Sequence, residues 1–281
     1  MLILSLIGAL VIGMTLGLMG SGGSILTLPL LVYMLGREGD IAIAESLAIV
    51  GGIAAVGVIP HASKRLVEWH TALIFGLPGM LGAFFGAIFG GWMDNTLQLI
   101  LFALVMLTAA TFMFRKSRAK PVTTSPDADQ VADPEHARPA PVLIALQGLV
   151  VGIMTGIVGV GGGFLIVPAL VLLGKLPIHR AVATSLLVIA ANSAVAFVRY
   201  ITGLADEGLY VDWGIIGMFV GVGACGTFVG KAVGGRISQR ALRRVFAIFL
   251  VVMGIVIMAR ETTRLLSTSE PNDPVPTENP D

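Results

Sequence analysis

The chain carries little charge for its length. Asp, Glu, Lys and Arg make up 12% of its 281 residues, whereas a soluble domain of this size has about 25%. The formal net charge is +1, and no basic block with interleaved aromatic residues occurs, which argues against a nucleic-acid partner. The charged residues stand mostly in predicted loops, and no nucleophile, base or acid pair with catalytic spacing is present. We therefore do not expect an enzyme.

Metal-binding residues are also scarce. Cys225 is the one cysteine and lies in an apolar run. It cannot form an intrachain disulfide or a thiolate cluster, and we expect a packed thiol. The 4 histidines show no metal-ligand spacing. We expect no metal and no cofactor.

Long apolar runs make up most of the chain. Hydrophobic residues are 56% of the sequence, and the mean hydropathy is +0.91. Runs of about 20 apolar residues with almost no charge predict transmembrane helices. The apolar segments cover residues 1–35, 41–60, 71–92, 96–114, 141–174, 180–200, 211–233 and 241–259. The first segment lacks a positively charged start and a clear cleavage site, so we interpret it as part of the mature membrane domain.

Two polar stretches divide the chain. Residues 115–140, "RKSRAKPVTTSPDADQVADPEHARPA", are rich in proline and charge and predict a flexible linker. The linker separates an N-terminal membrane domain, 1–114, from a C-terminal one, 141–260. Residues 261–281 are polar and contain prolines, which predicts a disordered tail.

The two membrane domains resemble each other in sequence. "GLMGSGGSILTLPLL" at 17–31 aligns with "GIVGVGGGFLIVPAL" at 156–170, an offset of 139 that also pairs "AESL" with "ATSL". From Trp69 and Trp213 onward the offset is 144, which indicates a five-residue insertion near "LADEG". An internal repeat of about 140 residues, built from membrane helices, is typical of secondary transporters.

Segments 1–35 and 141–174 are too long for one straight helix across lipid. At 1.5 Å per residue each would reach roughly 50 Å, against a hydrocarbon core of about 30 Å. Each glycine near the middle of a segment lowers helix stability by about 1 kcal/mol relative to alanine, so a cluster favours a break. The two arms form either one bent span or a hairpin that returns to its starting side.

Charge placement favours the hairpin, because Lys and Arg favour cytoplasmic loops. If both long segments cross the membrane once, the 18 Lys and Arg residues divide 10 to 8. If 141–174 returns to its own side, they divide 14 to 4, with the linker cytoplasmic. For 1–35 the hairpin rests on the repeat alone. We predict an all-α polytopic membrane protein of two inverted repeats. Each repeat has one broken or re-entrant helix hairpin and three transmembrane helices, and the glycine tips meet near the bilayer midplane.

The glycine tips predict an anion site. A P-loop is disfavoured, because no Lys-Ser/Thr follows "GVGGG" and no βαβ unit surrounds it. Exposed backbone N–H groups and the N-termini of half-helices favour negative charge. Close helix packing, which also needs small residues, is the alternative. The predicted donors are Gly20, Ser21, Gly22, Gly23, Ser24, Gly159, Gly161, Gly162 and Gly163.

Polar residues in the neighbouring spans complete the candidate substrate site. Ser46, Thr184 and Ser185 serve either as helix caps or as part of the anion site. Asn192 lies about a dozen residues into an apolar span, where it forms either an interhelical hydrogen bond or a substrate-facing amide. Glu45, the counterpart of Thr184, is the candidate for proton coupling if it is buried in the membrane. The alternative is a first-turn glutamate near the surface.

Two glycine ladders stand outside this site. They comprise Gly82, Gly86 and Gly90 in one half and Gly226, Gly230 and Gly234 in the other. A spacing of four puts each ladder on one helix face, which predicts close packing within the fold or at a homodimer contact.

The duplicated "GxxGxGG…P" segments, the "ESL" and "TSL" helix starts and the 4+4 segment count resemble the TauE/SafE family of sulfite and organosulfonate exporters. The resemblance covers nearly the whole chain except the linker and tail. It implies a bacterial inner-membrane permease for small sulfur-containing anions such as sulfite or sulfoacetate. The first half departs from the second, since "GSGGS" replaces "GVGGG" and Glu45 replaces Thr184. This asymmetry leaves room for a different small organic anion.

The sequence predicts an anion transporter in the lipid bilayer that works by alternating access, and the resemblance implies that it is an exporter. A passive anion channel is the competing hypothesis, since interrupted helices fit both classes. A channel would conduct without saturation or coupling, whereas paired inverted halves favour a transporter.

Overall fold

The computed structural model describes residues 2–20, 23–37, 39–118, 141–158, 163–172, 174, 176–234, 248, 251–252, 254–260 and 262. Every secondary-structure element defined in these ranges is an α-helix. The elements are α1 (Leu2–Met19), α2 (Ser24–Met34), α3 (Gly39–Ala62), α4 (Trp69–Gly91), α5 (Asn95–Arg118), α6 (Pro141–Val158), α7 (Gly163–Leu172), α8 (Ile178–Asp206) and α9 (Trp213–Gly234).

Five of these helices are long and apolar enough to cross a membrane: α3, α4, α6, α8 and α9. Large apolar side chains point outward from them, as on α4, where Leu73, Leu77 and Leu81 are more than half exposed. Exposed leucines at this spacing suit a lipid surface. The chain is therefore an all-α, multi-pass membrane protein, as the composition predicts. Cys225 is also exposed, on α9, so the prediction of a packed thiol is wrong; a thiol is apolar enough to face lipid.

The first long apolar segment is broken where the glycines predict. α1 ends at Met19, and Gly20 adopts a left-handed conformation with φ +69°, which glycine reaches without strain. Beyond the break the chain turns back along α1. A Cβ on Gly23 would meet the Ile12 carbonyl oxygen, and one on Gly8 would meet the Leu30 side chain. α1 and α2 therefore form a hairpin.

The second long segment has the same two arms. α6 ends at Val158, α7 begins at Gly163, and the two helices contact each other. The turn predicted at Gly159, Gly161 and Gly162 lies outside the described residues.

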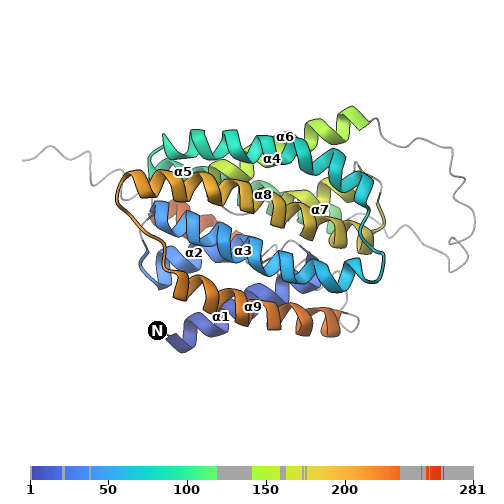
Figure 1. The fold of residues 1–281 in the computed structure, drawn as a ribbon, viewed down its shortest axis with the longest axis horizontal. Coiled ribbons are helices and arrows are strands. Elements are labelled where there is room, and N and C mark those ends of the chain that lie inside the picture. The colour runs from blue at the N-terminus through green and yellow to red at the C-terminus, as the bar shows by residue number, and fades with distance from the viewer. Residues whose placement is uncertain are drawn as a thin grey trace, which may run out of the picture.

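In the fold, helices of the N-terminal half pack against helices of the C-terminal half. α1 packs along α9, and α4 packs along α6. α3 and α8 lie side by side between these two pairs (Figure 1). The first helix of the N-terminal half, α1, therefore packs against α9 of the C-terminal half. The first helix of the C-terminal half, α6, packs against α4 of the N-terminal half.

Glycines allow the exchanged helices to approach at backbone distance. A Cβ on Gly13 would meet the carbonyl group of Gly223. The offsets of 139 and 144 convert this pair into Gly152 and Gly79, where the same contact occurs. Three further contacts match in the same way: Gly17–Thr227 with Gly156–Ala83, Gly226–Leu10 with Gly82–Leu149, and Gly230–Met14 with Gly86–Ile153. The α1–α9 and α4–α6 crossings are thus equivalent residue by residue.

These contacts show what most glycines of the two ladders pack against. Gly82 and Gly86 face the α6 backbone, while Gly226 and Gly230 face the α1 backbone. Gly90 faces the hydroxyl group of Tyr200. The described ladder glycines pack within one chain, so a homodimer would have to use a different surface.

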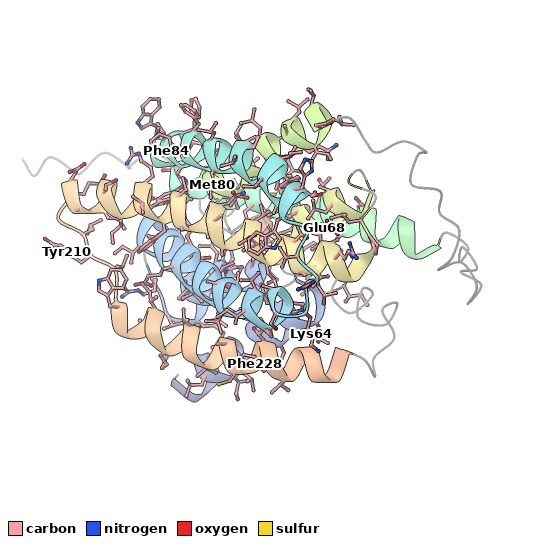
Figure 2. All side chains as sticks on the ribbon, turned by 45° about the vertical axis from the view of Figure 1, so that its right-hand side comes forward. Lys64, Glu68, Met80, Phe84, Tyr210 and Phe228 are labelled. Atoms are coloured by element: carbon pink, nitrogen blue, oxygen red, sulfur yellow. The ribbon has the colours of Figure 1, made fainter. Side chains whose placement is uncertain are left out.

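α3 and α8 run in opposite directions through the molecule. Figure 1 shows α3 beginning at the left and α8 beginning at the right. The α3–α4 loop, with Lys64 and Glu68, therefore lies at one end, and Tyr210 of the α8–α9 loop lies at the other (Figure 2). Repeat-equivalent loops thus stand at opposite ends of the helices.

The glycine contacts predict a contrast between two positions on α9. Gly226→Ala would drive a methyl group into the α1 backbone at Leu10 and Met14, and overpacking of this kind costs about 1–3 kcal/mol. Gly221 has open space where its Cβ would lie, so Gly221→Ala should be neutral or stabilising by up to about 1 kcal/mol. The thermal unfolding midpoint in detergent checks this. Equal midpoints for the two variants would contradict the α1–α9 contact.

Candidate functional site

The polar residues selected from the sequence are buried. Ser24, Glu45, Ser46, Thr184, Ser185 and Asn192 all have 0% exposure. Gly163 begins α7, and Ser21, Gly22, Gly159, Gly161 and Gly162 lie outside the described residues. Polar side chains buried in an apolar membrane protein must find partners within the protein or bind a ligand.

Glu45 forms a polar junction at the beginning of α3. Arg37, in the loop that follows α2, donates from Nε to its Oε2 at 3.0 Å and also contacts Oε1. The backbone N–H of Asp212, just before α9, donates to Oε1 at 2.9 Å. Glu45 is therefore not a surface glutamate of the first turn. Its carboxylate ties the α2–α3 loop and the start of α9 to α3.

Arg37 was not among the sequence candidates, although a signal for it exists. A carboxylate inside an apolar segment needs a nearby cation, and Arg37 is the nearest one along the chain, eight residues before Glu45. The sequence carries no comparable signal for the contact between Glu45 and Asp212, because Asp212 contributes its backbone N–H and belongs to the other half of the chain.

Thr184 forms the equivalent junction at the beginning of α8. Its Oγ1 accepts a hydrogen bond of 3.0 Å from the backbone N–H of Glu68, just before α4. The Glu68 carboxylate pairs with Arg180. The repeat offsets convert Glu45 into Thr184 and Asp212 into Glu68. One half therefore uses a carboxylate and the other a hydroxyl to hold the same backbone position.

Ser185 contacts the tip of the first hairpin. Its one O–H lies within hydrogen-bond distance of two carbonyl oxygens, that of Val182 at 2.8 Å and that of Gly20 at 3.2 Å. Ser46 is the repeat equivalent of Ser185, yet its buried Oγ has no hydrogen-bond partner. The two related hydroxyls thus differ in their surroundings.

The Gly20 tip lies near the beginning of α8. Gly20 packs against Val182 and Ser185, within about two turns of the start of α8. Asn192 is seven residues further along, or roughly 10 Å at 1.5 Å per residue. The tip therefore lies toward one end of α8 and not beside its midpoint, and the predicted meeting of the tips near the bilayer midplane stays a prediction.

Asn192 and Ser193 are unpartnered polar residues near the midpoint of α8. Both have 0% exposure, and neither Nδ2 nor Oδ1 of Asn192, nor Oγ of Ser193, has a hydrogen-bond partner. Asn192 faces Gly79 of α4, and Ser193 faces Gly51 of α3. Asn192 therefore does not form the interhelical hydrogen bond that was one of its two predicted roles.

The predicted site residues that the structure describes in α3 and α8 are spread along these helices. Glu45 and Ser46 lie near the start of α3, Thr184 and Ser185 near the start of α8, and Asn192 between the ends. Because α3 and α8 are antiparallel (Figure 1), equivalent positions move to opposite ends of the helix pair. Ser46, Thr184, Ser185 and Asn192 therefore lie at separate positions along the helix pair, and the anion site that they were expected to share stays a prediction.

Comparison with known proteins identifies the family of this chain. The family model for the sulfite exporter TauE/SafE matches residues 5–257. The chain belongs to the TauE/SafE family. Among its relatives, a probable membrane transporter protein of Xylella fastidiosa is 34% identical over 91% of this chain and 94% of its own length. Another, from Methanocaldococcus jannaschii, is 24% identical over 89% of this chain and 94% of its own. No solved structure matches the chain.

Membership of the TauE/SafE family makes the chain a membrane transporter, and its apolar helices agree with this. Within the described residues, no group of three His, Cys, Asp or Glu side chains could hold a metal ion. Among the described residues, the buried side-chain atoms without a hydrogen-bond partner belong to Ser46, Asn95, Gln98, Asn192 and Ser193. Asn192 is the one of these at which neither polar atom of the side chain has a partner.

The two arginine–glutamate pairs should differ in their contribution to stability. Arg37→Met leaves the Glu45 carboxylate, which is 0% exposed, without its cation, and breaking such a pair costs about 3–5 kcal/mol. Arg180→Met breaks a pair whose side chains are 51% and 31% exposed, which should cost about 0–1 kcal/mol. Unfolding titrations in detergent with increasing sodium dodecyl sulfate measure both. Similar losses for the two variants would contradict the buried junction at Glu45.

Proposed function

We propose that this transporter exports small sulfur-containing anions, such as sulfite or sulfoacetate, across the bacterial inner membrane by alternating access. The observation that carries the proposal is the unpartnered pair Asn192 and Ser193. A buried polar group left without a hydrogen bond costs about 1–3 kcal/mol. Such a cost is explained if the group binds a solute that enters and leaves.

The chemistry of the pair suits an oxyanion. The Asn192 amide has two N–H donors and the Ser193 hydroxyl has one, and sulfite and sulfonate oxygens are acceptors. The two side chains face different helices, α4 and α3, so we assign the anion to the Asn192 amide. The repeat equivalent of Asn192 is Ile53, which packs against Gly223, just as Asn192 packs against the equivalent Gly79. The polar group is therefore specific to one half and is not needed for the helix crossing.

Inverted repeats give the proposal its transport cycle. The matched α1–α9 and α4–α6 contacts and the opposite directions of α3 and α8 (Figure 1) support two halves related by inversion in the membrane. Exchange of conformation between such halves opens a central site to each side in turn. The hairpin tips would then lie near the ends of the path.

The positions of the Arg and Lys side chains indicate how the protein is oriented in the membrane. Arg37 pairs with Glu45 beside Asp212, and Arg260 lies over the ring of Tyr33. Arg37 and Arg260 belong to the minority of four cations that the sequence assigns to the outer side. We place the opposite end, with Lys64 and Arg65, in the cytoplasm together with the 115–140 linker.

Asn192→Leu should separate transport from stability. In liposomes the variant should move sulfite or sulfoacetate at least tenfold more slowly than the wild type, because the donors for the anion are gone. Its unfolding midpoint should rise, because leucine is similar in size to asparagine and replaces a buried amide that has no hydrogen-bond partner. Ile53→Leu, at the equivalent position, is the control and should keep near wild-type flux.

Three outcomes of this flux assay would contradict the proposal. They are a lack of flux of any small organosulfur anion by the wild type, wild-type flux by Asn192→Leu, and a lowered midpoint in that variant. Conductance that never saturates would indicate a passive channel.

Proton coupling through Glu45 is a separate prediction. Its carboxylate already holds Arg37 and the Asp212 N–H, so a proton would have to compete with Arg37. We propose that this exchange couples the cycle to a pH gradient. Glu45→Gln should then abolish the stimulation of flux by a pH gradient while leaving downhill flux measurable. Unchanged stimulation would remove Glu45 from coupling.

A further inference from the structure

One buried glycine of α4, Gly76, is not explained by close helix packing. Apart from its chain neighbours and the backbone of its own helix, a Cβ on Gly76 would have one atom within 4 Å, Cγ2 of Val188 at 3.7 Å. Of the buried glycines that the structure describes, Gly76 alone could carry a Cβ without a contact shorter than 3.4 Å. Room for at least one methyl group therefore lies between Gly76 and Val188.

This space adjoins the unpartnered amide of Asn192. A Cβ on Gly79 would lie 3.0 Å from Nδ2 of Asn192. Gly76 precedes Gly79 by three residues on α4, and Val188 precedes Asn192 by four residues on α8. Residues at these spacings lie on the same helix face, about 5–6 Å apart. The space is therefore one helical turn from the amide, where α4 and α8 lie side by side (Figure 1).

The space and the amide differ in polarity. The side chain facing Gly76 is Val188, which is buried and apolar, whereas both polar atoms of Asn192 lack a partner. Mostly apolar walls with a few polar groups are typical of small-molecule sites. Room beside a buried glycine forfeits dispersion contacts, and an unpaired amide forfeits hydrogen bonds. A solute with one apolar and one acceptor group would supply both.

The other half of the chain has neither feature. The repeat equivalent of Gly76 is Val220, and Cγ2 of Val220 lies 2.8 Å from where a Cβ on Gly52 would be. The equivalent of Gly52 is Ala191, which restores only one methyl group. Asn192 likewise takes the place of an apolar residue. The crossing of these helices therefore does not require a glycine at 76 or an amide at 192.

We propose that Gly76 and Val188 form an apolar subsite beside the Asn192 amide, and that the two together select an organosulfonate over sulfite. The sulfonate oxygens accept hydrogen bonds from the Asn192 amide, and the carbon attached to sulfur occupies the space at Gly76. Sulfite has no carbon group to place there. This inference rests on the proposed function, because it names the substrate class of the same site.

Gly76→Ala tests the subsite by filling it with one methyl group. In liposomes, the ratio of kcat/KM for methanesulfonate to kcat/KM for sulfite should fall at least tenfold, because one carbon in an apolar pocket changes selectivity by about 10–200-fold. The unfolding midpoint should equal or exceed that of the wild type, since the added Cβ makes only an ordinary contact and alanine favours the helix. Gly221→Ala, the same change in open space on α9, is the control and should keep the wild-type ratio.

Three results would overturn the subsite and leave the proposed function intact. The first is a wild-type protein that prefers sulfite to methanesulfonate, and the second is an unchanged ratio in Gly76→Ala. The third is a lowered unfolding midpoint in Gly76→Ala, because the glycine would then serve the helix backbone near Pro78.

A binding readout in detergent separates the two proposals without transport. Anions that bind the folded protein raise its unfolding midpoint, and acetate and formate are a second pair that differs by one methyl group. Methanesulfonate should raise the wild-type midpoint more than sulfite does, and Gly76→Ala should lose this difference. A Gly76-dependent preference for acetate over formate, with no binding or flux of either sulfur anion, would overturn only the proposed function. Binding of none of the four anions would overturn both.

Discussion

The arrangement depends on the backbone approach of α1 to α9 and of α4 to α6. Only glycine permits it, because a Cβ at Gly13 or Gly152 would fall on the carbonyl group of the facing helix. In a membrane, where lipid is as apolar as the helices, such close packing supplies the association that the hydrophobic effect cannot. These two crossings exchange helices between the halves, and the exchange leaves α3 and α8 as the central pair.

Much of the fold could be predicted from the sequence, because its signals are local. Hydropathy gives the apolar helices, and the glycine clusters predict that α1 and α2, and α6 and α7, are separate helices. The repeat offsets predict which residues are equivalent, and the structure shows equivalent contacts at those residues. What the sequence could not give was the partner of each glycine ladder. A spacing of four defines a face but does not say whether that face meets its own half, the other half or a second copy.

The candidate site could be predicted only as a list of residues. Glu45, Thr184 and Asn192 are buried, as polar residues in apolar spans should be, but their positions relative to one another could not be predicted. Antiparallel α3 and α8 move equivalent positions to opposite ends, so Glu45 and Thr184 became two separate junctions. The missed contacts come from backbone N–H groups of Asp212 and Glu68, and backbone groups carry no residue-specific signal in a sequence.

The central claim is that equivalent loops of the two halves face opposite sides of the membrane. Lys64→Cys and Tyr210→Cys, each in a Cys225→Ser background, test it most directly, since both native residues are exposed and lie in equivalent loops (Figure 2). With a membrane-impermeant maleimide on intact spheroplasts, the account predicts labelling at position 210 and none at position 64 until the membrane is permeabilised. Labelling of both positions from the same side would contradict it.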